Sequence, residues 1–287
     1  MQIDPDLPIR KTSPLRYLGR SFLLALLAGL VAIALPSRGE SDPHKQSPIP
    51  LVTSKATIPP GERFPDANPT FSGTFSYVTV ERTTHKEPNG HETVTNVTMK
   101  IPWDSTHHEH QVRLKIGKPG PDGKPVPTTY RVLQIHMHRH GEHTMDGGEY
   151  QLEMHCVLTD DSETATEPKA VLGFFIVQGE QNDNLNFYFG NLQHPDGRVE
   201  LGSAQDLNHL LPHDKTYFSY HGSLTTPNLD NTPNPTPILW YVLRNEIHVS
   251  NEQYNKYFHS VEEHFRVLQL NNTSDVWLII PQPLGQK

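Results

Sequence analysis

The sequence has almost no cysteine. Cys156 is the only one among 287 residues, so an internal disulfide is excluded and the folded chain has to be stabilised by its core. Cys156 itself lies in a hydrophobic stretch, and we interpret it as a small buried side chain rather than as a nucleophile.

The sequence is also poor in basic residues. Lys and Arg together number 24 against 32 Asp and Glu, which gives a formal net charge of −8. No basic stripe is present that could replace the counterions of phosphate groups, so the composition argues against a nucleic-acid partner. The 26 prolines disfavour a helical bundle and favour many short strands joined by turns.

Long hydrophobic runs are missing as well. The longest one, residues 21–36, contains about 14 apolar residues, fewer than the roughly 20 that span a bilayer. Basic residues precede this run and small residues suitable for cleavage follow it, as in a secretory signal. We expect residues 1–39 to be a signal peptide, or an N-terminal membrane anchor if they are not cleaved. In both cases we expect the rest of the chain to be exported, whether secreted, periplasmic or on the extracellular face.

The remaining chain is organised as one domain. Residues 40–70 are rich in Pro, Ser and charge and indicate an extended leader, which residues 71–287 follow as the folded domain. Alternating apolar and polar residues are typical of half-buried strands, and short helices are predicted near residues 204–211 and within 251–264. We therefore predict a mainly β fold, with a large, mostly antiparallel central sheet and a few short peripheral helices. The strongest strand candidates are residues 75–83, 92–101, 130–138, 149–158, 170–179 and 237–245.

Three histidines lie where strand alternation places them on one surface. Gln134, His136 and His138 share one face of a predicted strand, since successive side chains point to opposite faces. In the next predicted strand, Glu153 and His155 share a face. The segment between these strands contains enough glycine to turn the chain back, so the register can bring His155 beside the other two histidines. The opposite face of the first strand is apolar and can pack against a core; its residues are Leu133, Ile135 and Met137.

This arrangement predicts a zinc site. Three neutral imidazoles suit Zn²⁺ and leave the fourth tetrahedral position open for water, whereas a structural site fills all four positions, often with the cysteines that this chain lacks. Gln134 and Glu153 each precede a candidate ligand by two residues and can accept its second ring N–H. For any single histidine, an exposed residue on an edge strand is the simpler interpretation. Three on one face, beside two acceptors, favour the metal site.

Several segments resemble the alpha-class carbonic anhydrases and occur in that family's order. The resemblance covers roughly residues 46–272, although the leader lacks the aromatic cluster that usually precedes the QSP motif. It implies a zinc lyase, with Zn²⁺ as the cofactor and carbon dioxide and bicarbonate as the small-molecule substrate and product. The segments are QSPI (46–49), YRVLQIHMH (130–138), GEHTMDGGEYQLEMHCV (141–157), AVLGFF (170–175), YFSYHGSLTTP (217–227), the Trp of LWYVL, the SNEQ run from Ser250 and FRVLQLNN (265–272).

The resemblance also implies roles for single residues. By position, the zinc ligands are His136, His138 and His155. Thr225 falls on the hydroxyl that accepts the hydrogen bond of the zinc-bound hydroxide, and Glu142 falls on the carboxylate that orients this hydroxyl. An apolar pocket for carbon dioxide is implied as well, with plain core packing as the alternative for its residues. The pocket residues are Val157, Val171, Leu224 and Trp240, with Thr226 on the substrate side.

The reaction implied is the reversible hydration of carbon dioxide to bicarbonate and a proton, by attack of zinc-bound hydroxide. A shuttle has to remove the proton, and histidine suits this role. His91 follows Asn89 and Gly90 as the family's shuttle does, but the stretch from His91 to His136 is long, and the NVTM run at Asn96 offers a competing alignment. Two further alternatives are a catalytically silent carbonic-anhydrase-like binding module and a secondary esterase activity at the same zinc.

Overall fold

The computed structural model describes residues 42–61, 63–103, 111–226 and 232–282. The predicted signal peptide or anchor, residues 1–39, lies outside these residues. All the described residues belong to one unit, residues 38–287. Within the described part of the chain, no helix combines the length and the hydrophobicity that crossing a bilayer requires.

The strands of the described residues form one large sheet and one small sheet. The small sheet contains β1 (Pro50–Leu51), β7 (Thr144–Met145) and β8 (Gly148–Glu149). The large sheet contains twelve strands: β2 (Thr70–Ser72), β3 (Phe75–Lys86), β4 (Glu92–Lys100), β5 (Arg113–Pro119), β6 (Pro125–His138), β9 (Leu152–Asp160), β10 (Ala170–Gln178), β11 (Gly197–Gln205), β12 (Tyr217–Ser223), β13 (Pro237–Leu243), β14 (Ile247–Val249) and β15 (Trp277–Ile279).

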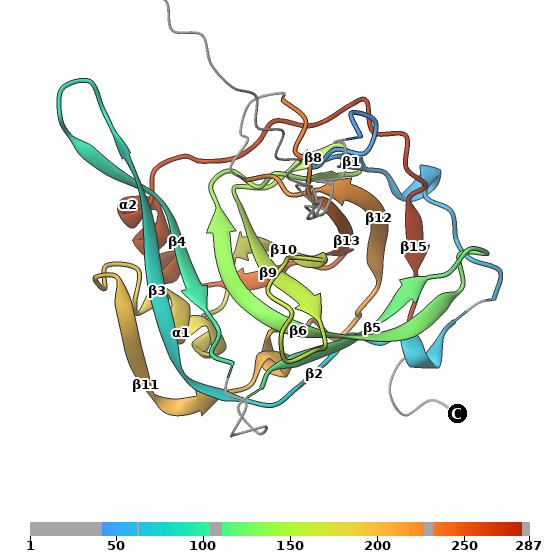
Figure 1. The fold of residues 1–287 in the computed structure, drawn as a ribbon, viewed down its shortest axis with the longest axis horizontal. Coiled ribbons are helices and arrows are strands. Elements are labelled where there is room, and N and C mark those ends of the chain that lie inside the picture. Colours follow the sequence, from blue (N-terminus) through green and yellow to red (C-terminus); the bar gives the residue numbers. More distant parts are fainter. Residues whose placement is uncertain (1–41, 62, 104–110, 227–231, 283–287) are drawn as a thin grey trace, which may run out of the picture. The chain divides into compact units, whose positions relative to one another are not determined.

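The large sheet is mixed, with mostly antiparallel neighbours. Its main path runs in the order β11–β3–β4–β6–β9–β10–β13–β12–β15 (Figure 1). The two exceptions are the parallel pairs of β10 with β13 and with β14. Parallel neighbours need a long connection, and the chain between β10 and β13 includes β11 and β12. The prediction of a mainly β fold around a mostly antiparallel central sheet is confirmed.

The six predicted strands all form, but the other strands of the large sheet were not predicted. The six predicted segments correspond to β3, β4, β6, β9, β10 and β13, as their alternation indicated. One of the strands that were not predicted is β11. This strand pairs only with β3 at the end of the sheet's main path, and Val199 is its one buried residue. Its sequence therefore carries little of the alternation that reveals a half-buried strand.

The helices are short, as predicted. The helix expected within residues 251–264 is α2 (Asn251–Ser260), which begins with a capping box between Ser250 and Gln253. The helix expected near residues 204–211 is the single 3₁₀ turn η5 (Leu207–Leu210). The remaining helices of the described residues are η1 (Thr53–Lys55), η2 (Pro65–Ala67), η4 (Asp183–Leu185) and α1 (Asn186–Phe189).

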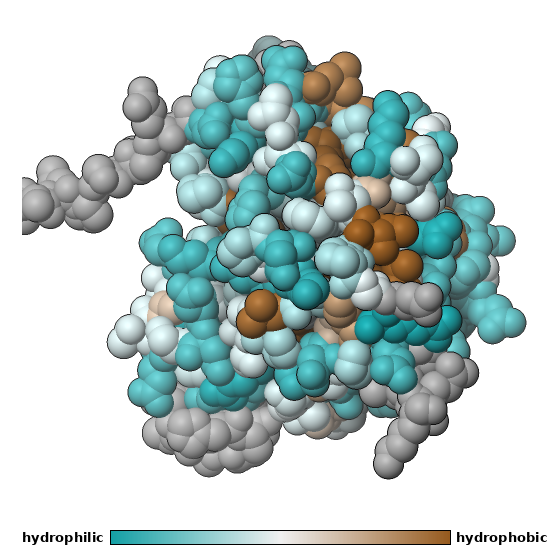
Figure 2. Space-filling model, turned by 90° about the vertical axis from the view of Figure 1, so that its right-hand side faces the viewer, coloured by the Kyte–Doolittle hydropathy of each residue, from teal (hydrophilic) through white to brown (hydrophobic). Residues whose placement is uncertain are grey.

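The two faces of the sheet contribute to two hydrophobic clusters. The larger cluster joins β3, β4, β6 and β9 to residues of α1 and α2, such as Tyr188 and Tyr257; Figure 1 shows both helices near β3, β4 and β11. The smaller cluster includes Val157, Val171 and Trp240. On the face shown in Figure 2, hydrophobic side chains appear only as separate patches among hydrophilic ones. Burial of apolar surface in these clusters takes the stabilising role that the missing disulfides cannot.

The predicted leader packs along the domain. Ser47 is completely buried and its backbone N–H donates to Ser223 Oγ. Further on, Thr57 and Phe64 form isolated bridges with Trp277 and Pro281 near the end of the chain. These contacts place residues 42–70 against β12 and against the C-terminal segment.

Candidate metal centre

Strands β6 and β9 bring the three candidate histidines together. The strands are antiparallel, and His136 lies directly opposite His155 in their register. His138 is two residues further along β6, so alternation places its side chain on the same face as that of His136. All three side chains are buried. The register that the sequence allowed is therefore the one that forms.

A β-bulge in β6 places one side chain on a different face of the strand from the predicted one. The register against β9 shifts between Val132 and Gln134, so Leu133 is the extra residue. We expected Leu133 to share the core face with Ile135 and Met137, and that prediction is wrong. Leu133 packs against the smaller hydrophobic cluster instead, because an extra residue in a strand reverses the side on which alternation places its neighbours.

The three imidazole rings form a tight donor set. Their centroids lie 5.0 Å apart for His136 and His138, 5.3 Å for His136 and His155, and 4.7 Å for His138 and His155. One nitrogen of each ring lies within 4.8 Å of the others, and the Nε2 atoms of His136 and His138 are 3.1 Å apart. Tetrahedral zinc with nitrogen ligands at about 2.0–2.1 Å separates its ligand atoms by roughly 3.3 Å. The three residues therefore fit such an ion.

Neighbouring acceptors fix which ring nitrogen carries the proton. Nδ1 of His138 lies 3.0 Å from the backbone oxygen of His264, and a carbonyl only accepts, so Nδ1 donates. Nε2 of His155 lies 3.0 Å from Oε1 of Glu153 and donates for the same reason. Neutral His138 and His155 thus keep lone pairs on Nε2 and Nδ1, the atoms that belong to the donor set. The structure forms the contact between Glu153 and His155 that we expected.

Burial also favours neutral rings at His136 and His138. It disfavours the charged form, and so it lowers the pKa of His138 and lowers that of His136 well below its usual value; the neighbouring histidines lower the pKa of His136 further. For Glu153, burial raises the pKa, but His143 and His155 outweigh it and hold the pKa of the carboxyl well below its usual range. At His155, burial lowers the pKa, but the same charged carboxylate outweighs it and raises the pKa, so Glu153 acts as a charged acceptor behind this ring.

Glu142 and Thr225 are both buried, but they are not joined as we expected. Oε1 of Glu142 accepts a hydrogen bond of 2.8 Å from the backbone N–H of Arg266. Oε2 is buried without a hydrogen-bond partner and lies 4.0 Å from Nδ1 of His155. The expected hydrogen bond from Thr225 is therefore not formed at this oxygen. A buried acceptor without a donor is costly, and Oε2 remains available for a hydroxyl.

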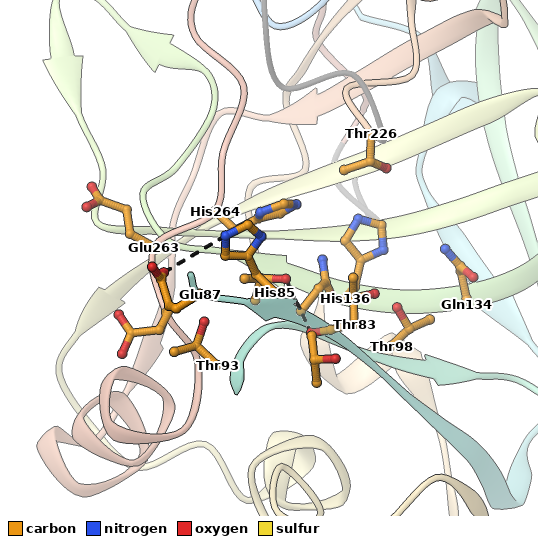
Figure 3. Close-up of a pocket in the computed structure, with 14 residues that line it drawn as sticks. Thr83, His85, Glu87, Thr93, Thr98, Gln134, His136, Thr226, Glu263 and His264 are labelled. Atoms are coloured by element: carbon orange, nitrogen blue, oxygen red, sulfur yellow. Dashed lines mark hydrogen bonds and ion pairs between the residues drawn. The ribbon is translucent and has the colours of Figure 1, made fainter. Parts of the chain in front are cut away.

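Gln134 does not contact its histidine either. Nδ1 of His136 is buried and has no hydrogen-bond partner, so the acceptor role expected for Gln134 is not seen. Both side chains line the same cavity, and Figure 3 shows the Gln134 amide apart from the His136 ring. Residues two apart on a strand are separated by about 6.6 Å, so their contact depends on rotamers that sequence spacing does not set.

The expected carbon dioxide pocket residues fall into two groups. Val157, Val171 and Trp240 are buried in the smaller cluster, against which Leu224 packs. They lie side by side, since Val171 pairs with Val157 on one side and with Trp240 on the other. The Trp240 ring lies 5.0 Å from the His155 ring, measured between centroids. This apolar group therefore adjoins the donor set.

A cavity of about 760 Å³ reaches the same centre. Thr226 lines it, together with His136 and Gln134, and Figure 3 shows Thr226 across the cavity from Thr98. His91 does not line this cavity. It is exposed at the turn of the β3–β4 hairpin, where its backbone N–H donates to Asn89 Oδ1.

One residue of the site, His143, was not predicted from the sequence. Its side chain is completely buried, with Nδ1 2.7 Å from Glu153 Oε1 and Nε2 2.7 Å from the Tyr220 hydroxyl. His143 lies in the connection between β6 and β9, where strand alternation does not predict direction. The only signal was its position inside a segment covered by the family resemblance.

Comparison with known proteins agrees with this fold. The family model for eukaryotic-type carbonic anhydrases matches residues 37–273. Carbonic anhydrase 4 of Mus musculus is 30% identical over 211 residues, which cover 66% of this chain and 64% of that protein. Carbonic anhydrase 4 of Rattus norvegicus is 27% identical over 279 residues, which cover 87% of this chain and 76% of that protein. The chain thus spans just under two thirds of the mouse protein.

Two solved structures share the fold. The alpha-carbonic anhydrase of Thermovibrio ammonificans, in complex with the inhibitor sulfanilamide, matches with a TM-score of 0.56 at 21% identity and covers 82% of this chain and 87% of its own. The alpha-carbonic anhydrase of Photobacterium profundum gives the same TM-score and identity, with coverages of 82% and 89%. Because the family model covers most of the sequence, the chain belongs to the eukaryotic-type, or alpha, carbonic anhydrase family.

Proposed function

We propose that this protein catalyses the reversible hydration of carbon dioxide, with a zinc ion held by His136, His138 and His155. The observation that carries the proposal is the buried set of three ring nitrogens, two of which have their lone pairs directed by acceptors behind the rings. Family membership supports the reaction class, since the matched relatives are named carbonic anhydrases.

The side chains around this centre have separate tasks. When bound, zinc supplies a Lewis acid that makes water a nucleophile near neutral pH. Glu153 holds the His155 ring in the tautomer that presents Nδ1. We propose that the Thr225 hydroxyl donates to Oε2 of Glu142, which has no partner in this structure. The lone pairs of Thr225 would then be left to receive and orient the attacking water.

The apolar group beside His155 is the proposed binding place for carbon dioxide. Val157, Val171 and Trp240 offer the substrate no hydrogen bond on this side except through the Trp240 indole, whose Nε1 already donates to the Ser223 backbone oxygen at 2.9 Å. A small uncharged molecule therefore fits this wall better than bicarbonate does, which favours release of the charged product into the polar cavity.

The N-terminal segment is part of the proposal. We propose that residues 1–39 direct export as a signal peptide or anchor, and that residues 71–287 form the catalytic domain behind a leader of residues 40–70. The short hydrophobic run with basic residues before it supports this assignment. Determining the N-terminus of the exported protein by mass spectrometry distinguishes a cleaved signal from a retained anchor.

Stopped-flow measurement of carbon dioxide hydration tests the reaction. The full-length protein should hydrate carbon dioxide when it holds one zinc ion per chain, lose the activity in a chelator and regain it with zinc. His155→Ala should remove most of the metal and lower the rate by at least about a hundredfold, whereas His213→Ala, at an exposed histidine outside the cavity, should change neither. A folded, zinc-loaded protein without activity would support the binding-module alternative.

A further inference from the structure

A row of polar side chains leads from the candidate metal centre along the β3–β4 hairpin. Thr98 of β4 pairs with His136 of β6, and the hairpin continues from there toward its turn. Two of the pairs that follow line the same cavity with both of their residues, and they extend this wall outward from the metal centre. They are Asn96 with Thr83, and Thr93 with His85.

A bulge directs the outer part of this row into the cavity. The register of the hairpin shifts between Thr83 and Thr84, and both residues line the cavity together with His85. Thr83 pairs with Asn96 and Thr84 with Val94, so the extra residue is Thr95 on β4. Thr83 and His85 are two residues apart on β3 and share a face by alternation. The extra residue in β4 lets Asn96 and Thr93, which are three residues apart, line the same wall.

His85 lies where this wall meets the solvent. Its side chain is 65% exposed, and its Nε2 is 3.9 Å from Oε1 of Glu87. Glu262, Glu263 and His264, from the segment after α2, line the cavity at the same end, and Figure 3 shows the rings of His85 and His264 near each other with Glu87 and Glu263 beside them. The His85 ring is therefore open to cavity water and to bulk water, with acidic groups nearby.

The proposed reaction produces a proton that has to leave this cavity. Carbon dioxide and water give bicarbonate and one proton per turnover, and the three histidines of the donor set are buried away from bulk solvent. His91 lies outside the cavity. The backbone oxygen of His264 holds His138, which ties that residue to the metal centre itself. Among the histidines of the described residues that line the cavity, His85 is the most exposed and lies apart from the donor set.

Resting on the proposed function, we propose that His85 carries this proton between cavity water and bulk solvent. Water along the hydroxyls of Thr98, Thr83 and Thr93 connects the metal centre to the ring. The neutral imidazole takes up one proton on its free nitrogen and then releases it to a buffer base, so the ring ends each turnover neutral and no electrons are exchanged.

Hydration rates in weak and strong buffer test this role on the full-length protein. General acid–base groups contribute about 10²–10⁴-fold, and because buffer replaces part of this, we expect His85→Ala to lower the maximal rate about tenfold in weak buffer. Added imidazole should restore the rate, and the rate in strong buffer should be unchanged. His213→Ala is the matched control, and His91→Ala tests the expectation from sequence.

The outcomes separate this role from the proposed function. A His85→Ala protein that equals the wild type in weak buffer overturns the role, as does a loss confined to His91→Ala or His264→Gln. A wild-type protein that binds zinc but hydrates no carbon dioxide overturns the proposed function, and the role of His85 falls with it.

A second measurement does not depend on activity. With Co²⁺ in place of Zn²⁺, the ring-proton signals of His85 in NMR spectra, assigned by their loss in His85→Ala, should shift or broaden. Those of His213 should stay unchanged. If the His85 signals are unaffected while those of His91 respond, His85 does not face the metal across the cavity and the proposal is wrong.

Discussion

At the scale of single residues, Glu153 organises the candidate site. Its completely buried carboxylate accepts the backbone N–H groups of Glu142 and His143, both at 2.8 Å on Oε2. Its Oε1 lies 2.7 Å from Nδ1 of His143 and 3.0 Å from Nε2 of His155. One side chain thus fixes both the turn before β9 and the orientation of a metal ligand.

Replacing Glu153 by Gln should weaken metal binding. The amide keeps the size of the side chain, but it brings a donor toward N–H groups and removes the charge that holds the His155 tautomer. We expect zinc affinity to fall by about 10- to 100-fold, measured by competition with a chelator. Glu163→Gln, at an exposed position, is the control. An unchanged affinity would show that His155 is oriented by other groups.

At the scale of elements, two helices support the strand that carries the ligands. Met137 lies between His136 and His138, and its backbone N–H donates to the Tyr188 hydroxyl of α1 at 3.1 Å. Its backbone oxygen accepts from the Tyr257 hydroxyl of α2 at 2.7 Å. β4 pairs with β6 only as far as His136, so these hydroxyls satisfy backbone groups that the sheet leaves open.

Tyr257→Phe tests how much the hydrogen bond from α2 to β6 stabilises the protein. The substitution leaves the buried Met137 oxygen without its donor, and we expect a loss of about 1–3 kcal/mol in the free energy of unfolding, measured by urea denaturation. Tyr254→Phe, one turn earlier on the same helix, provides the comparison. Equal effects of the two substitutions would mean that the hydroxyl bond to β6 contributes nothing of its own.

At the scale of the whole molecule, Arg266 joins segments that are far apart in the sequence. The side chain is completely buried, and Nη1 donates to the Ser47 backbone oxygen at 2.8 Å. Nη2 donates to the backbone oxygen of Thr232 at 2.7 Å, while the backbone N–H donates to Glu142. The leader, the segment before β13 and the candidate site therefore meet at one guanidinium group.

Arg266→Met should destabilise the entire domain. Several buried acceptors lose their donor at once, and we expect a cost of about 3–5 kcal/mol in the free energy of unfolding. Arg63→Met, at an exposed arginine, should change the free energy of unfolding little. The loss of stability is measured by comparing the denaturation midpoints of the two variants. Similar midpoints would contradict this role of Arg266.

Metal binding should also be visible in the stability of the whole molecule. A ligand that binds only the folded state at a thousand times its dissociation constant adds about 4 kcal/mol, which for a domain of this size corresponds to a rise in melting temperature of about 8–16 °C. Calorimetry with zinc and with a chelator measures the difference. It should vanish in His136→Ala, and a rise that persists in this variant would place the stabilising metal elsewhere.

Much of the site could be predicted from the sequence, for a local reason. Alternation along β6 and β9 is a property of each strand alone, and it was enough to put His136, His138 and His155 on one face. Residues outside strands carried no such signal, which is why His143 was missed. Alternation also failed at Leu133, because a bulge changes the count of residues and leaves no mark in the hydrophobic pattern.

The sequence by itself determined the mainly β class, six of the strands and the strand faces that carry the three histidines, because these follow from the order of apolar, polar and imidazole side chains along short segments. Only the tertiary structure decided which acceptor reaches which ring. Glu153 contacts His155, whereas Gln134 stays apart from His136 and Thr225 does not meet the free oxygen of Glu142. The cavity wall was decided in the same way, with His85 on it and His91 outside it. Rotamers, bulges and the packing of distant segments set these contacts, and none of them is a property of one segment.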